Sequence, residues 1–149
     1  MNLPDGDHVM RYVPWSRLIT DETGNILGIF PHAFQLRGGE TYLSVNWIEY
    51  FEGDSERRKC ASVLAFRRTL QVGPKSAFGI GNVGEVKKVC SDSGAKARII
   101  HRKRKDNEAH SAIYGIPPDD LNLLQSLAQD VFIEVVRNAD VPAEVRPGS

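Results

Sequence analysis

Short β-forming segments separated by turn residues restrict the fold of this chain more than any other feature. Each is bounded by Gly, Pro or polar residues, and the predicted strands are 8–13, 26–30, 41–43, 97–101 and 111–116. The glycine-rich stretch 77–90 is predicted to be a hairpin or strand–turn–strand. Because strands and helices do not alternate as βαβ units, we predict an α+β fold, with a mainly antiparallel sheet packed by two or three helices.

Three helices are predicted from apolar periodicity and capping residues. They cover residues 45–51 after a Ser44 cap, a segment starting near Asp54 or Ser55, and 119–136 with Asp119 as the cap. In the second helix, Arg67 falls within the apolar stripe. Either the helix ends near Phe66, or Arg67 is a partly buried cation with a partner; we favour the first alternative.

Length and composition indicate one domain of ordinary globular character. The 149 residues suffice for a single core, and we expect residues 1–5 and 140–149 to be frayed. No apolar run reaches the roughly 18–20 residues of a membrane span, and the acidic N-terminus does not resemble a signal peptide. Cys60 and Cys90 lie far apart, as expected of buried thiols in a reducing compartment. We therefore predict a cytoplasmic protein with no membrane partner.

Charge is distributed unevenly along a chain whose net charge is zero. Residues 1–54 carry three Arg and eight acids, residues 55–105 carry fourteen Lys or Arg and three acids, and residues 106–149 carry two Arg and eight acids. The basic middle third predicts a positive face for a polyanion or an acidic protein. In the alternative interpretation, the acidic thirds fold against it and neutralise it.

The densest basic stretch lies in the predicted loop between the strands 97–101 and 111–116. Nucleic-acid or partner contacts are assigned first to Arg98, Arg102, Lys103, Arg104 and Lys105, and second to Arg57, Arg58, Lys87 and Lys88. Such side chains neutralise phosphates without requiring sequence readout. Charge is the only basis for this prediction, because no signature of a known nucleic-acid-binding motif is present.

Two further patterns are weighed and set aside. His101 and His110 flank the base of the same loop, but two histidines are too few for a metal site, and no metal or cofactor is predicted. Residues 79–84 match G-x-G-x-x-G. No strong buried strand precedes the first glycine, so we interpret the motif as a glycine-rich turn rather than a dinucleotide site.

Three segments together resemble a group of small uncharacterised bacterial proteins with no known activity. They read HVMRYV from His8, LSVNWIEYF from Leu43 and HSAIYGIP from His110. A second resemblance is to ADP-ribosyltransferase-type domains, which carry an Arg or His on the first strand and a Tyr and Ser on the second. Arg11 with His8, and Tyr42 with Ser44, match that pattern. The Glu motif of the family is missing, and residues 106–108 (Asp-Asn-Glu) are its nearest match.

Three functional hypotheses follow. The first is a non-catalytic accessory protein of the bacterial cytosol that contacts nucleic acid, or an acidic protein, through the basic segment. The second is a small enzyme, with NAD as a candidate ligand and weak catalytic candidates His8, Arg11, Tyr42 and Ser44. The third is a subunit of a larger assembly with an aromatic N-terminal interface. The sequence favours the first and leaves oligomeric state open.

Overall fold

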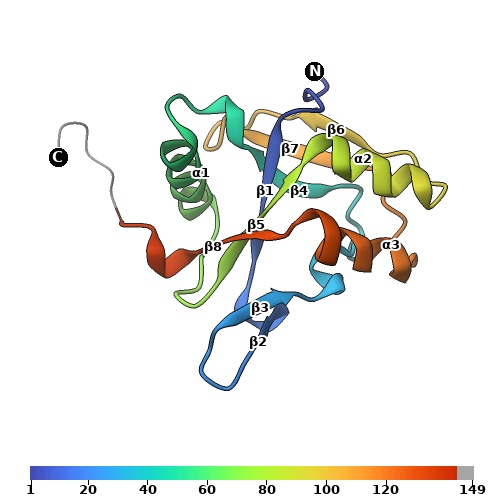
Figure 1. The fold of residues 1–149 in the computed structure, drawn as a ribbon. Helices are drawn as coiled ribbons and strands as arrows, with labels where there is room; N and C mark the ends of the chain where they lie inside the picture. Colours follow the sequence, from blue (N-terminus) through green and yellow to red (C-terminus); the bar gives the residue numbers. More distant parts are fainter. Residues whose placement is uncertain (144–149) are drawn as a thin grey trace.

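A six-stranded antiparallel sheet forms the centre of the computed structural model, which describes residues 1–143 (Figure 1). The strand order is β6-β7-β4-β1-β5-β8. The strands of this sheet are β1 (His8–Val13), β4 (Leu43–Trp47), β5 (Ala77–Asn82), β6 (Arg98–His101), β7 (His110–Tyr114) and β8 (Glu134–Arg137). A separate ribbon pairs β2 (Leu18–Thr20) with β3 (Ile26–Ile29). The predicted α+β class is confirmed.

Helices cover both faces of this sheet, because apolar side chains alternate along its central strands. On one face, Met10 and Phe78 pack under Phe66 of α1 (Ser55–Thr69). On the other, Val9 and Val45 belong to a larger core with α2 (Val83–Asp92) and α3 (Leu121–Ser126). A π-helical turn, Leu127–Val131, continues α3. Within residues 1–143, no helix is long and apolar enough to cross a membrane.

The segment 41–51 differs from its prediction. In place of a strand at 41–43 and a helix at 45–51, β4 runs from Leu43 to Trp47 and a 3-10 turn, Ile48–Tyr50, follows it. Leu43 and Val45 are buried in the larger core, whereas Ser44 lies on the opposite face. This two-residue period is that of a strand, and it outweighs the capping potential of Ser44.

The stretch 77–90 is a strand followed directly by a helix, not a hairpin or glycine-rich turn. Gly79 and Gly81 lie inside β5, where a Cβ at Gly81 would come within 3.0–3.1 Å of the Phe132 ring. Asn82 then caps α2 by accepting the amide of Glu85. Gly81 therefore provides room for the Phe132 ring and Gly79 for the Ile29 side chain, which spacing along the chain does not reveal.

The last predicted helix is shorter than expected. Asp120, rather than Asp119, caps α3, and the helical turns end at Val131 so that residues 134–137 form the edge strand β8. β8 pairs with β5, with Val136 opposite Phe78. Apolar periodicity alone did not distinguish the final valines of a helix from a short strand.

Helix α1 continues past Phe66 to Thr69, so the alternative that was not favoured for Arg67 is the observed one. The Arg67 guanidinium donates to the side-chain and main-chain oxygens of Asn138 and to the carbonyls of Val141 and Pro142. Carbonyl and amide oxygens thus compensate for the partial burial of this cation. They also fix Asn138, Val141 and Pro142, the last two of which belong to the segment 140–149 expected to be frayed.

The N-terminus is also held in place, contrary to prediction. Leu3 is buried, and its amide donates to the carbonyl of Ile99, while Asn2 forms a bridge with Ile100 along the outer edge of β6. The first residues thereby cover one edge of the sheet, which protects its free backbone groups. Of the other predicted tail, residues 144–149 lie outside the described part of the chain.

Candidate nucleic-acid interface

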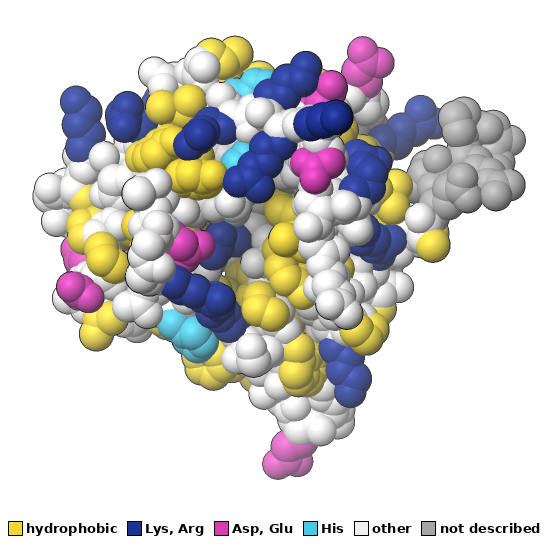
Figure 2. All heavy atoms as spheres, turned by 180° about the vertical axis from the view of Figure 1, so that it is seen from behind, with side chains coloured by type: hydrophobic (Ala, Val, Ile, Leu, Met, Phe, Trp, Pro, Cys, Tyr) yellow, Lys and Arg dark blue, Asp and Glu magenta, His cyan; other side chains and the backbone are white. Residues whose placement is uncertain are grey.

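Three arginines gather around two tyrosine rings on the outer part of the sheet. The Arg102 Cζ atom lies 4.9 Å from the centre of the Tyr42 ring, and the Arg98 Cζ atom lies 5.2 Å from that of Tyr114. Arg102 also donates to the Tyr114 hydroxyl at 2.5 Å, and Arg104 donates to the Tyr42 hydroxyl at 2.9 Å. We call these five residues the Arg–Tyr surface. Figure 2 shows basic side chains beside hydrophobic ones on the face seen from behind.

Strand register explains why these residues meet. Arg98 of β6 pairs with Tyr114 of β7, and directly paired residues of antiparallel strands point to the same face. Ser44 of β4 pairs with Ala112, two residues from Tyr114, which brings Tyr42 to the same side. The two tyrosine rings are 5.4 Å apart at their centres. The loop that follows β6 then returns Arg102 and Arg104 over these rings.

A buried amide pair anchors this loop. The main chains of Arg104 and Asn107 exchange two hydrogen bonds, and the Asn107 side chain donates to Asn46 Oδ1 at 2.7 Å. Asn46 in turn donates to the carbonyl of Ser62 in α1. Both asparagines are almost completely buried. The loop is therefore tied to β4 and α1, and the cations are carried on a fixed turn.

Acids do not neutralise the three arginines. Arg98, Arg102 and Arg104 are exposed, and none forms an ion pair with a carboxylate of residues 1–143. Of the neighbouring lysines, Lys103 pairs with Glu108 at 3.4 Å, whereas Lys105 lines a shallow depression beside Arg68. The positive charge of the Arg–Tyr surface is thus available to a ligand.

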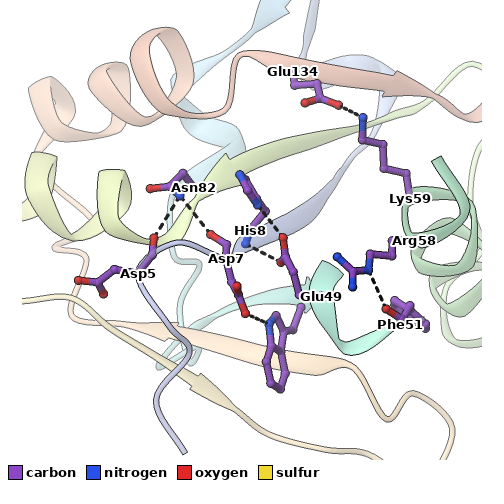
Figure 3. A network of polar contacts seen from close by, with 10 residues as sticks. Asp5, Asp7, His8, Glu49, Phe51, Arg58, Lys59, Asn82 and Glu134 are labelled. Atoms are coloured by element: carbon purple, nitrogen blue, oxygen red, sulfur yellow. Dashed lines mark hydrogen bonds and ion pairs between the residues drawn. The ribbon is translucent and has the colours of Figure 1, made fainter. Parts of the chain in front are cut away.

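The second-choice cations do not join this surface. Lys87 and Lys88 both lie on α2. Lys87 pairs with Asp5 at 2.6 Å, and Lys88 pairs with Asp92 at 3.3 Å. Arg57 and Arg58 lie in the first turns of α1, where the Arg58 Nε–H group donates to the carbonyl of Phe51 (Figure 3). Lys87 is therefore neutralised by an acid of the first third, as the alternative interpretation expected, whereas Lys88 is paired within its own helix.

The two loop histidines point to opposite faces of the sheet. His101 is paired with Ser111, contacts Trp47 and Tyr50, and bonds the carbonyl of Glu108. His110 lies beside Tyr42 and Ser44. Burial, and then the charges of the nearby arginines, lower the pKa of His110. No group of three or more potential metal ligands occurs among the described residues.

The four weak catalytic candidates do not form one site. His8 lies at the far end of β1, where its amide and its Nδ1 atom both meet the Glu49 carboxylate at 2.7 Å (Figure 3). Arg11, Tyr42 and Ser44 lie towards the other end of that strand. Pairing between β1 and β4 stops at Met10 and Asn46. Beyond that point, Arg11 donates to the carbonyls of Ala33 and Ser44.

Sequence reasoning missed Tyr114 and Glu49. Tyr114 is predicted to lie in a strand, but its ring contact with Tyr42 joins residues 72 positions apart in the chain. That contact forms only when the distant strands pair. The alternation of Ala112 and Tyr114 was the available signal, since it puts both residues on the face of Arg98. Glu49 was hidden by its assignment to a helix, and no sequence pattern linked it to His8.

The beginning of α2 does not provide a phosphate site. The amides of Val83 and Gly84, which a phosphate would need, donate to the carbonyls of Asp7 and Asp5. The side chain of Asn82 reaches the same two carbonyls (Figure 3). The N-terminal segment therefore occupies the helix end, and setting aside the glycine motif is justified by a feature the sequence did not show.

The residues nearest to an ADP-ribosyltransferase Glu motif are engaged in other contacts. The Glu108 carboxylate accepts the Tyr50 hydroxyl at 2.7 Å and pairs with Lys103. The Tyr50 hydrogen bond, and then Lys103, lower the pKa of this carboxyl. Comparisons of the chain with protein families, with curated proteins and with solved structures found no match.

Proposed function

We propose that the Arg–Tyr surface binds nucleic acid, with the chain acting as an accessory binding protein of the bacterial cytosol. The observation that carries the proposal is the gathering of three exposed arginines, none paired with a described carboxylate, over two tyrosine rings. The cytosolic setting agrees with the free thiols of Cys60 and Cys90.

The tyrosines favour phosphate binding by restricting the arginines before a ligand arrives. A free Arg side chain loses rotamer entropy when it is immobilised at an interface. Ring stacking and the two hydroxyl contacts hold Arg102 and Arg104 in one arrangement, so less entropy remains to be lost. A guanidinium can then present parallel N–H groups to two phosphate oxygens.

The spacing of the cations favours a polymer over a single phosphate. The guanidinium groups of Arg98, Arg102 and Arg104 lie over two rings whose centres are 5.4 Å apart. Adjacent phosphates of a nucleic-acid strand carry one charge each at short intervals, so three neighbouring cations suit such a strand better than a lone phosphate. No base-reading device accompanies the arginines, so we expect contacts to the backbone and little sequence preference.

Fluorescence anisotropy with labelled single-stranded and duplex oligonucleotides, measured over a salt series, tests the proposal. Replacing Arg98, Arg102 and Arg104 with Gln should weaken binding about tenfold or more. It should also reduce the slope of log K against log salt by about two units for a single strand. The matched control replaces Arg57, Lys87 and Lys88 with Gln, which removes the same charge elsewhere and should change the affinity less than about threefold.

Two results would contradict the proposal. One is an absence of binding to any oligonucleotide at low salt; the other is equal losses in the two triple variants. A labelled poly-glutamate peptide serves as the acidic-protein probe. Tighter binding of this peptide than of oligonucleotides, with the same dependence on the three arginines, would assign the surface to an acidic partner instead.

A further inference from the structure

A serine, a histidine and a main-chain carbonyl are aligned at the border of the Arg–Tyr surface. The Ser44 Oγ atom lies 3.3 Å from His110 Nε2, and His110 Nδ1 lies 2.8 Å from the carbonyl oxygen of Arg102. We propose that Ser44 is a nucleophile activated by His110, acting on small carboxylic esters that carry a negative charge. This activity lies beyond nucleic-acid binding and does not depend on it.

The contacts of His110 define which nitrogen carries its proton. A carbonyl oxygen can only accept, so Nδ1 must hold the hydrogen in the bond to Arg102. In the neutral ring, Nε2 then has a free lone pair directed at the Ser44 hydroxyl. Burial lowers the pKa of His110, which keeps the ring neutral at pH 7. A base, its hydroxyl partner and an orienting acceptor are the elements of nucleophilic catalysis by serine.

Arg11 holds the main chain of the same serine in place. Its Nη1 atom donates to the main-chain oxygen of Ser44 at 3.0 Å, where β1 and β4 have separated. The guanidinium forms no ion pair with a carboxylate of the described chain, and burial lowers its pKa to about 10, still charged at neutral pH. Because Arg11 follows Met10 in β1 and donates to Ala33 of the larger core, its side chain lies on the face of the sheet opposite the Ser44 hydroxyl. It therefore fixes the main chain of Ser44 without contacting the reacting oxygen.

The substrate class follows from this charge distribution. Arg102 lies on the same face as the Ser44 hydroxyl, above the Tyr42 ring that contacts His110. An ester bearing a carboxylate or phosphate group is attracted to this region, whereas a cationic ester is repelled. Ser44 is half-buried in a strand, which favours a small acyl group.

The proposed reaction has two steps. First, Ser44 Oγ bonds to the ester carbonyl carbon while its proton passes to His110 Nε2; the carbon–oxygen bond to the alcohol then breaks, and the alcohol leaves with that proton. Second, water attacks the acyl-serine carbonyl and gives a proton to His110. The acyl–Oγ bond breaks, Ser44 recovers the proton, and the carboxylic acid is released. Ester and water are the only reactants, and no oxidant or reductant is required.

Covalent labelling of the full chain by a fluorophosphonate is the direct test. Ser44 Oγ should bond to phosphorus as fluoride leaves, giving one adduct by intact mass, located at residue 44 by peptide mapping. Ser44→Ala should abolish this adduct, and Ser16→Ala, which alters an exposed serine, should not. His110→Gln should slow labelling at least about 100-fold, whereas His101→Gln on the opposite face should not. Thermal melts of each variant exclude loss of fold as the cause.

A pH series and a substrate series complete the test. His110 is faced by Arg102, Arg104, Asp106, Tyr42 and Ser44. The labelling rate should fall at acid pH with a midpoint below 6.5, the ordinary histidine pKa. Hydrolysis of a negatively charged p-nitrophenyl ester should exceed that of a neutral one. An absence of any adduct, labelling at other serines only, or a rate unaffected by His110→Gln would overturn the proposal.

Discussion

Two groups of cations from the same basic third of the chain have different surroundings. On α2, Lys87 and Lys88 face Asp5 and Asp92 in exposed ion pairs. On the Arg–Tyr surface, arginines instead face tyrosine rings, which orient a cation without cancelling its charge. The comparison shows that the number of basic residues in a segment does not determine whether it can bind an anion. Anion binding depends instead on which groups fold against the basic residues.

The largest effect is expected from a substitution in the buried asparagine pair that supports the Arg–Tyr surface. Asn46→Ala removes the partner of the buried Asn107 amide, which would then be left without a hydrogen bond to β4. We expect the free energy of unfolding to fall by about 1–3 kcal/mol, the usual cost of an unsatisfied buried polar group. Urea denaturation measures it, and Asn122→Ala, at an exposed position of α3, is the control.

The same variant should also weaken oligonucleotide binding, because the turn that carries Arg104 loses its anchor. Losses of stability and affinity that both match those of Asn122→Ala would mean that the loop needs no support from β4. The Arg–Tyr surface would then differ from α2 only in the residue types beside its cations, not in how firmly those cations are held.

The tyrosine hydroxyls provide the next test. Changing Tyr42 and Tyr114 together to Phe keeps the rings and all charges but removes the acceptors of Arg104 and Arg102. Affinity for a single strand should fall about two- to fivefold, as expected for weak hydrogen bonds that position a ligand-binding group. The salt dependence should remain unchanged, since no cation is lost.

Tyr12→Phe is the matched control, because its hydroxyl accepts the amide of Gly73 away from this surface. An equal loss in the control would attribute the effect to general stability. A changed salt slope in the double variant would show that the hydroxyls do more than orient the arginines.

Local patterns predicted β1, β3 and β7 well, because alternation and turn residues near each other in the chain specify them. They failed where a distant partner decides the outcome. Gly81 fits inside a strand where the Phe132 ring, 51 residues away, occupies the space beside it, and Gly79 fits where Ile29 does. The extension of α1 to Thr69 likewise depends on Asn138, which receives the guanidinium of Arg67.

The candidate site, too, was predictable only where local sequence determines it. Composition identified Arg98, Arg102 and Arg104, and the place of Arg102 and Arg104 on one loop followed from the strands on either side. Tyr114 and the Ser44–His110 contact required the β4–β7 register, which no pattern in a single sequence supplies. Pairing of Lys87 with Asp5 required the N-terminal segment to cross the start of α2. The basic residues were therefore predictable, and their availability was not.

The smallest effect should come from releasing the α2 lysines. Changing Asp5 and Asp92 to Asn removes both carboxylates and leaves Lys87 and Lys88 free, which adds two units of positive charge. Exposed ion pairs contribute about 0–1 kcal/mol, and α2 covers the other face of the sheet from Tyr42. We therefore expect oligonucleotide affinity at 0.15 M salt to rise less than about twofold, where the Debye length is about 8 Å. A tenfold gain by anisotropy would show that added charge alone creates a binding surface, and that the tyrosines are dispensable.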